Sequence, residues 1–113
     1  MYQLKETNFP DPVLANKSAT IYRCVQRSRK EYGDGGEGFA ASLSRQDAAV
    51  CNIVRACNAA LDMGQHLIRR ERLGIPQSAR DVFALLAQGG WIATALADSL
   101  KKMVGFRNFA GKE

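Results

Sequence analysis

Residues 44–76, SRQDAAVCNIVRACNAALDMGQHLIRRERLGIP, contain the longest helical pattern of the chain. Apolar or small residues recur along this stretch at alternating steps of four and three: Val50, Val54, Cys57, Leu61, Gly64 and Ile68. This spacing places them on one face of an α-helix. Several alanines surround the stripe, and small side chains let helices approach closely. We therefore expect this helix at the centre of the fold.

Local signals predict the ends of this central helix. Ser44 with Asp47 three residues later has the spacing of a capping pair and indicates the start. Gly74 and Pro76 favour an end near Leu73, because glycine often follows the last helical turn and proline cannot continue it. The segment would then be roughly 40 Å long at ~1.5 Å per residue.

A second long helix is predicted before the central one. Asp11 can accept hydrogen bonds from free amides at a helix start, and Pro12 suits the first helical position. The inward stripe is expected to be Leu14, Ser18, Ile21, Val25, Ser28 and Tyr32. The glycine-rich run at 33–38 should break this helix, since glycine is a poor helix former. Residues 1–10 are predicted to form an N-terminal arm.

Two shorter helices are predicted after the central one. Ser78 and Asp81 open the third, which the Gly89-Gly90 pair ends. Trp91 or Ile92 begins the fourth, and its inward side chains are expected to be Ile92, Leu96, Leu100, Met103 and Val104. No stretch is typical of a strand. The prediction is an all-α, up-and-down antiparallel four-helix bundle forming one domain, residues 11–113.

Composition limits the functional classes. At 113 residues with 46% hydrophobic residues, the core is small, and chains of this size often pair, so a homodimer is expected. No apolar run approaches the ~20 residues of a membrane span, which predicts a cytoplasmic protein. The formal net charge is +5, which permits nucleic acid or an acidic protein as partner. No metal site is expected, because His66 is the only histidine, and no cofactor is expected either. The three cysteines are interpreted as small buried hydrophobes.

Few residues have catalytic potential. His66 follows Asp62 by four residues, the spacing of a helical base and its orienting carboxylate, although such pairs are usually plain surface contacts. Arg107 stands near the C-terminal end, after Lys101 and Lys102 and before Lys112. Its planar guanidinium matches phosphate oxygens, and Gly105 is expected to loosen the helix just before it. Lys101, Lys102 and Arg107 are the candidate RNA-binding residues.

Four stretches resemble the HepT-like toxins, the HEPN-type ribonucleases of HepT/MntA toxin–antitoxin pairs. They are Ser44-Arg45-Gln46-Asp47, Arg55-Ala56-Cys57, the run from Leu73 to Ser78, and Met103-Val104-Gly105-Phe106-Arg107-Asn108. The resemblance extends from about Val13 to Ala110. It implies a homodimer of four-helix bundles in which two R-x4-H-x-Y motifs face each other across a cleft. In the family, the histidine transfers protons, the arginine steadies the phosphate, and the ribose 2′-oxygen attacks without a metal. The resemblance also implies a partner, an MntA-like nucleotidyltransferase antitoxin, which in the family adds AMP to the motif tyrosine.

The motif is carried over residue by residue. Arg107 matches the motif arginine and Asn108 the residue after it, while Lys112 stands at the histidine position and Glu113 follows. The tyrosine is expected to be missing. Lysine has a pKa of about 10.4 when unperturbed and is a poor base at neutral pH, so impaired catalysis is expected. A frameshift, an altered terminus or a non-catalytic relative would each explain this ending.

Three hypotheses remain open from the sequence. The first is a toxin ribonuclease subunit with impaired catalysis, with Arg107, Asn108 and Lys112 at the catalytic positions. The second is a non-catalytic helical binding partner of a minimal nucleotidyltransferase. The third is a helical homodimer with only a structural role.

Overall fold

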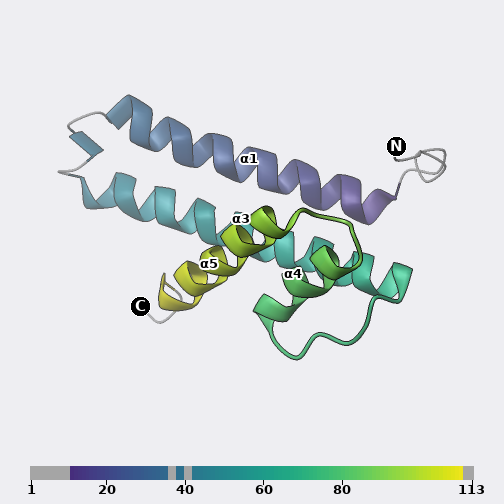
Figure 1. Cartoon of the computed structure of the whole chain (residues 1–113). Coiled ribbons are helices and arrows are strands. Elements are labelled where there is room, and N and C mark those ends of the chain that lie inside the picture. Colours follow the sequence, from purple (N-terminus) through teal and green to yellow (C-terminus); the bar gives the residue numbers. More distant parts are fainter. Residues whose placement is uncertain (1–10, 36–37, 40–41, 111–113) are drawn as a thin grey trace.

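The computed structural model describes residues 11–35, 38–39 and 42–110, in which the long elements are four α-helices and no strand occurs. Two long helices, α1 (Pro12–Gly35) and α3 (Leu43–Glu71), lie side by side and antiparallel (Figure 1). The shorter helices α4 (Ala79–Gln88) and α5 (Thr94–Ala110) pack on α3 and on each other. The all-α, four-helix prediction is confirmed, and the expected arm at 1–10 lies outside the described residues.

The arrangement is more open than a closed bundle. Among the described helices, α1 packs along α3 alone, whereas α4 and α5 cover the C-terminal part of α3 (Figure 1). The molecule is correspondingly elongated, measuring 47 × 30 × 21 Å. The far end of the α1–α3 hairpin therefore extends beyond the two short helices.

The helix starts follow capping rules, with two shifts from the prediction. The Asp11 carboxylate accepts from the backbone N–H groups of Val13 (2.9 Å) and Leu14 (3.4 Å), as expected for a cap. Ser78 caps α4 as predicted, accepting from the Asp81 N–H at 3.2 Å. The cap of α3 is Ser42 rather than Ser44. The fourth helix starts at Thr94, later than predicted.

The helix ends also differ slightly from the sequence pattern. The helix α1 continues through Gly33 to Gly35 before the glycine-rich run ends it. The central helix α3 ends at Glu71, because Arg72 adopts the left-handed conformation (φ 55°) and closes the last turn on the Ile68 carbonyl. Gly74 follows with φ 135°, a conformation that favours glycine.

The core lies between α3, α4 and α5. Its most enclosed side chains are Phe83, Ile68, Val82, Val104 and Cys57. The predicted stripe of α3 is buried from Cys57 to Ile68, whereas Val50 near its start is 37% exposed. Gly64 lies at a tight contact between α3 and α4, because a Cβ there would lie 2.7 Å from the Val82 Cγ1 of α4.

Some side-chain predictions are wrong. On α1, Leu14, Ile21 and Ser28 are half-buried as predicted, but Val25 and Tyr32 are exposed, and Cys24 (3% exposed) is buried instead of its neighbour. Leu96 is half-exposed, and Ala97 is buried in its place. Cys24 and Cys57 are buried as expected, but Cys51 is exposed. Within the described part of the chain, no helix is both long and apolar enough to cross a membrane.

Candidate functional site: an arginine between two helices

Arg107 projects from the last turns of α5 toward α3. Its Nε and Nη2 donate to the side-chain oxygen of Asn108 at 3.2 and 2.8 Å, and its Nη1 donates to the Asn58 oxygen of α3 at 3.3 Å. The expected loosening at Gly105 is wrong, because α5 continues without a break to Ala110. Arg107 is therefore held on a regular helix by two amide oxygens.

The charge of this guanidinium is not neutralised by a carboxylate among the described residues. Both of its partners, Asn58 and Asn108, are neutral amides. A guanidinium has five N–H groups, and three are engaged here, so donors remain for an incoming anion. Neutral partners fix the orientation of Arg107 and leave its charge for a phosphate.

The thiol beside this arginine is not a nucleophile. Cys57 of α3 is 0% exposed, and its Sγ donates to the Met103 carbonyl of α5 at 3.9 Å. Burial raises the pKa of the Cys57 thiol, and the positive charge of Arg107 offsets only part of that rise. Cys57 therefore stays protonated at neutral pH and serves packing.

The two lysines predicted to bind RNA lie elsewhere on α5. Lys101 and Lys102 precede Arg107 by six and five residues. At 3.6 residues per turn these separations turn the side chains about 120–140° around the helix axis from Arg107. The helix thus directs the lysines and Arg107 to different sides. Lys112 and Glu113 lie outside the described residues.

An additional cation, which was not predicted from the sequence, projects from α4 onto α5. Arg80, in the first turn of α4, places its guanidinium over Gly105: a Cβ built there would lie 2.9 Å from Arg80 Nη2. The sequence offered one signal for this contact, which is Gly105 inside a predicted helix. Alanine is the better helix former, so a glycine at such a position indicates that a neighbouring group occupies the space of a side chain.

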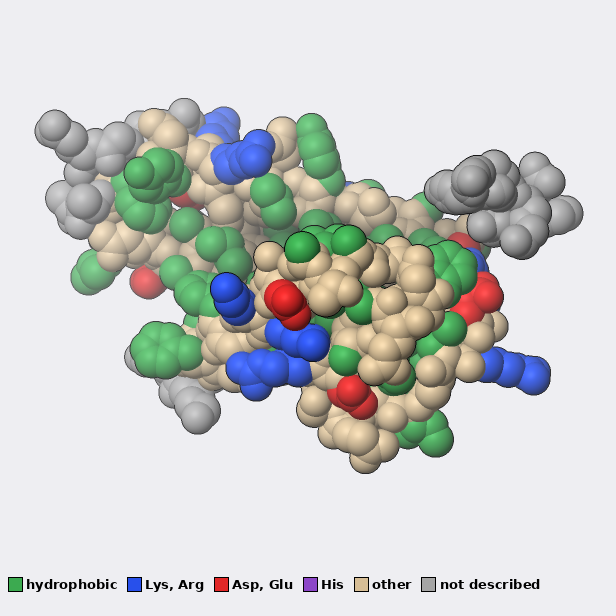
Figure 2. Space-filling view, viewed as in Figure 1, with side chains coloured by type: hydrophobic (Ala, Val, Ile, Leu, Met, Phe, Trp, Pro, Cys, Tyr) green, Lys and Arg blue, Asp and Glu red, His purple; other side chains and the backbone are tan. Residues whose placement is uncertain are grey.

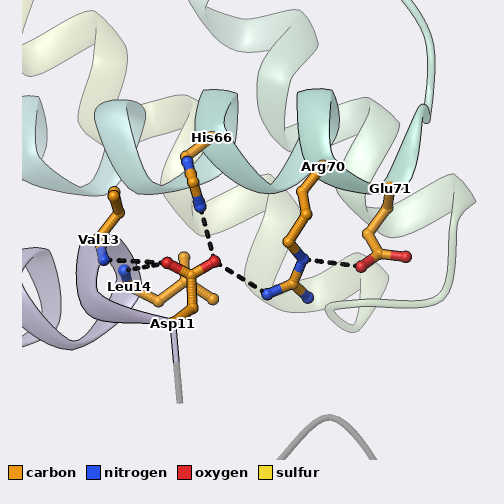
Figure 3. Close-up of polar contacts among 6 residues, drawn as sticks. All are labelled: Asp11, Val13, Leu14, His66, Arg70 and Glu71. Carbon is orange, nitrogen blue, oxygen red and sulfur yellow. Dashed lines mark hydrogen bonds and ion pairs between the residues drawn. The ribbon is translucent and has the colours of Figure 1, made fainter. Parts of the chain in front are cut away.

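A second polar cluster lies where α1 begins and α3 ends (Figure 3). The Asp11 carboxylate of α1 accepts from His66 Nε2 at 2.7 Å and from Arg70 Nη1 at 3.0 Å, both on α3. Arg70 also donates to Glu71 at 2.8 Å and lies 5.9 Å from the Trp91 ring centroid. The predicted Asp62–His66 pair is therefore wrong, because Asp62 instead forms an ion pair with Lys17 at 3.1 Å.

This second cluster is a structural clasp. The hydrogen bond from His66, supported by the Leu14 amide and Arg70, lowers the pKa of Asp11 to about 2 from its ordinary 3.8. An ionised carboxylate that accepts four hydrogen bonds is fully engaged and has no role left as a base. Within the described residues, no group of three or more His, Cys, Asp or Glu side chains is placed to hold a metal ion.

A hollow of about 520 Å³ lies at the far end of the hairpin. Its lining comes from α1 and from the start of α3: Lys30, Glu31, Ser42, Ser44, Arg45 and Ala48. It contains none of the predicted site residues, and it is separate from Arg107.

Comparison with known proteins identifies close relatives. A family model described as "Ribonuclease HepT-like" matches residues 21–110. The mRNA nuclease HepT of Shewanella oneidensis is 48% identical over 98 residues, which cover 87% of this chain and 73% of that protein.

Two solved structures are similar in fold and sequence. One is described as a toxin–antitoxin with AMP-PNP (TM-score 0.84, 47% identity, 88% of this chain and 75% of that one). The other is a tri-AMPylated Shewanella oneidensis HEPN toxin in complex with MNT antitoxin (TM-score 0.84, 46% identity, 89% and 75%).

Proposed function

The chain belongs to the HepT-like ribonuclease family, and from this premise we propose that it is a toxin subunit that binds and cuts RNA around Arg107. The observation that supports this role is the oriented guanidinium, which is held by Asn58 and Asn108 without a neutralising carboxylate in the described residues. A cation with fixed geometry and free donors stabilises the negative charge that grows on a phosphate during strand cleavage.

Each residue of the site has a separate role in the proposed cleavage. The ribose 2′-oxygen attacks the adjacent phosphorus, so no protein nucleophile is required. Arg107 holds the phosphate oxygens, and Asn58 and Asn108 are positioning residues that fix its plane. Proton transfer in the family falls to the histidine, where this chain has Lys112. General acid–base catalysis typically contributes ~10²–10⁴-fold, so cleavage by this chain should be slower by about that factor than with histidine.

Cleavage of a labelled single-stranded RNA tests the proposal with three variants. Arg107→Ala should abolish any cleavage. Arg107→Lys should also lower the cleavage rate strongly, because an ammonium keeps the positive charge but lacks the planar set of N–H donors. Lys112→His should raise the rate. An Arg107→Ala variant as active as the parent would exclude the proposed site, and an inert Lys112→His variant would contradict the assigned proton-transfer position.

A second candidate function is that of a non-catalytic binding partner. Lys112 at the histidine position favours it, and solved relatives contain a toxin with an MNT antitoxin. In this case the chain forms a complex with an MntA-like nucleotidyltransferase and does not cut RNA. Co-purification with the nucleotidyltransferase, without cleavage by either the chain or Lys112→His, would support this candidate. Absence of any complex would count against it.

We also propose that the chain acts as a homodimer in the cytoplasm. Large apolar side chains are exposed on the part of α3 that α4 and α5 leave uncovered and on the end of α5: Val50, Ile53, Phe106 and Phe109. Phe109 is 70% exposed, and association of two copies would cover it. Sedimentation should give a dimer, and Ile53→Glu should yield monomers. A monomeric parent chain would contradict this assembly.

A further inference from the structure

Gly105 is a glycine in the interior of a regular helix. It lies five residues before the end of α5, where glycine is one of the poorest helix formers. The backbone there needs no left-handed conformation, because only Gly74 and Gly90 among the described glycines have positive φ. The space of a side chain at Gly105 is instead taken by Arg80, whose Nη2 lies 2.9 Å from the position of a Cβ, so a larger residue there would displace the end of the arginine. Gly105 therefore functions as a seat for Arg80.

The seated guanidinium belongs to a basic surface. Arg80 is exposed and forms no hydrogen bond or ion pair within the described part of the chain. Lys101 lies one turn before Gly105 on the same side of α5, and Lys102 lies next to it. Figure 2 shows Lys and Arg side chains gathered on this face, over α4 and α5.

Nearby acidic residues do not pair with these cations. The Asp81 carboxylate accepts from the Gln77 N–H at 2.9 Å as part of the α4 cap. Asp98 has no ion pair with a described residue, although it lies within a turn of Lys101 and Lys102. Asp98 offsets part of the positive charge of Arg80, Lys101 and Lys102, and the surface keeps a net positive charge that a bound anion would neutralise.

We propose that Arg80, seated on Gly105 and flanked by Lys101 and Lys102, binds a phosphate of the RNA backbone. This inference rests on the proposed function and extends it. Gly105 and Arg107 are two residues apart, so their directions differ by about 160° around α5. An RNA strand that crosses α5, which is about 10–12 Å wide with its side chains, would pass from one guanidinium to the other. The phosphate contact at Arg80 then positions the strand that Arg107 holds at the scissile phosphate.

Two variants remove the contact in different ways. Arg80→Ala deletes the guanidinium. Gly105→Ala keeps it but displaces it, because the new methyl group occupies its seat and the end of an arginine side chain can move. Gly105→Ala should also raise the melting temperature by roughly 2–6 °C, since alanine stabilises a helix relative to glycine. Loss of RNA binding in a more stable protein cannot be caused by unfolding.

Each variant has a matched control on another helix. Arg69→Ala removes an exposed arginine from the last turn of α3, and Gly33→Ala fills open space in α1, where nothing lies within 4 Å of the new Cβ. The measurement is the affinity for a single-stranded RNA by fluorescence anisotropy across a range of salt concentrations. Both test variants should bind roughly 3–10-fold more weakly, with a salt slope smaller by about 0.7, the value for one lost phosphate contact on a single strand. Both controls should match the parent.

The outcomes separate this inference from the function on which it rests. If Arg107→Ala weakens RNA binding while Arg80→Ala and Gly105→Ala behave like their controls, the inference is wrong and the proposed function stands. If the parent chain does not bind RNA at any salt concentration, both are wrong. If the two variants weaken only the complex with a nucleotidyltransferase, this surface binds protein and the RNA contact is excluded.

Discussion

Replacing Gly64 by alanine should destabilise the protein, although the same change stabilises most helices. Gly64 lies at the contact between α3 and α4, and an added Cβ would lie 2.7 Å from Val82 Cγ1 and 3.2 Å from Leu86 Cδ1. Val82 is 0% exposed, and a β-branched side chain in a helix has one strongly preferred rotamer. The valine cannot turn away, so the two helices must separate.

The expected magnitude is the difference of two terms. Overpacking a well-filled core costs typically ~1–3 kcal/mol. Alanine in place of glycine within a helix contributes about 1 kcal/mol in the opposite direction. Taking ~2 kcal/mol for overpacking at this enclosed contact, the net loss is about 1 kcal/mol, or roughly 4 °C in melting temperature for a chain of this size.

The assay is thermal and urea unfolding of five proteins: the parent, Gly64→Ala, Val82→Ala, the double variant and a control, Gly33→Ala. Val82→Ala alone should cost about 2 kcal/mol, because buried methyl groups are lost and a cavity remains. In the double variant the new methyl group fills that cavity, so its loss should be clearly smaller than the sum of the single losses. Gly33→Ala is the control and should be at least as stable as the parent. A Gly64→Ala protein that melts at or above the parent, with additive behaviour in the double variant, would refute the tight α3–α4 contact.

Two further predictions concern ionisation and thiol access. The pKa of Asp11 is lowered from 3.8 to about 2, so its ionic contribution to stability is present above pH 3.8 and is lost as pH falls toward 2. Asp11→Asn should therefore lower stability at pH 7 and flatten the acid unfolding curve between these values; an unchanged acid limb would argue against the clasp with His66. In a thiol-reagent assay of the folded protein, Cys51 should react first and the two buried cysteines only after denaturant is added, so three rapid equivalents would contradict the packing.

The fold was largely predictable from local signals. Asp11 and Ser78 cap helices as expected, because capping depends on residues two or three positions apart. The stripe from Cys57 to Ile68 marked the face of α3 that packs on the short helices. The openness of the bundle was not predictable, because an apolar stripe indicates that a helix is covered and does not specify by which neighbour.

The candidate site was less predictable. Arg107 was found through its motif, but its contact with Asn58 joins positions 49 residues apart, and no periodicity indicates such a contact. The partner of His66 was assigned to the nearest carboxylate in sequence, Asp62, whereas the fold brings Asp11 closer. Arg80 was missed because it lies against Gly105, a residue without a side chain. A glycine in a helix indicates such a contact only when the neighbouring helix is known.

The clasp around Asp11 makes the beginning of one helix dependent on the end of another. The same carboxylate caps the first turn of α1 and binds His66 and Arg70, which are 55 and 59 positions away in sequence. A capping residue normally helps its helix to form early, from local interactions alone. Here half of the carboxylate's bonds form only after the chain has turned back on itself, so α1 reaches full stability when the hairpin closes, and the two long helices should be gained and lost as one cooperative unit.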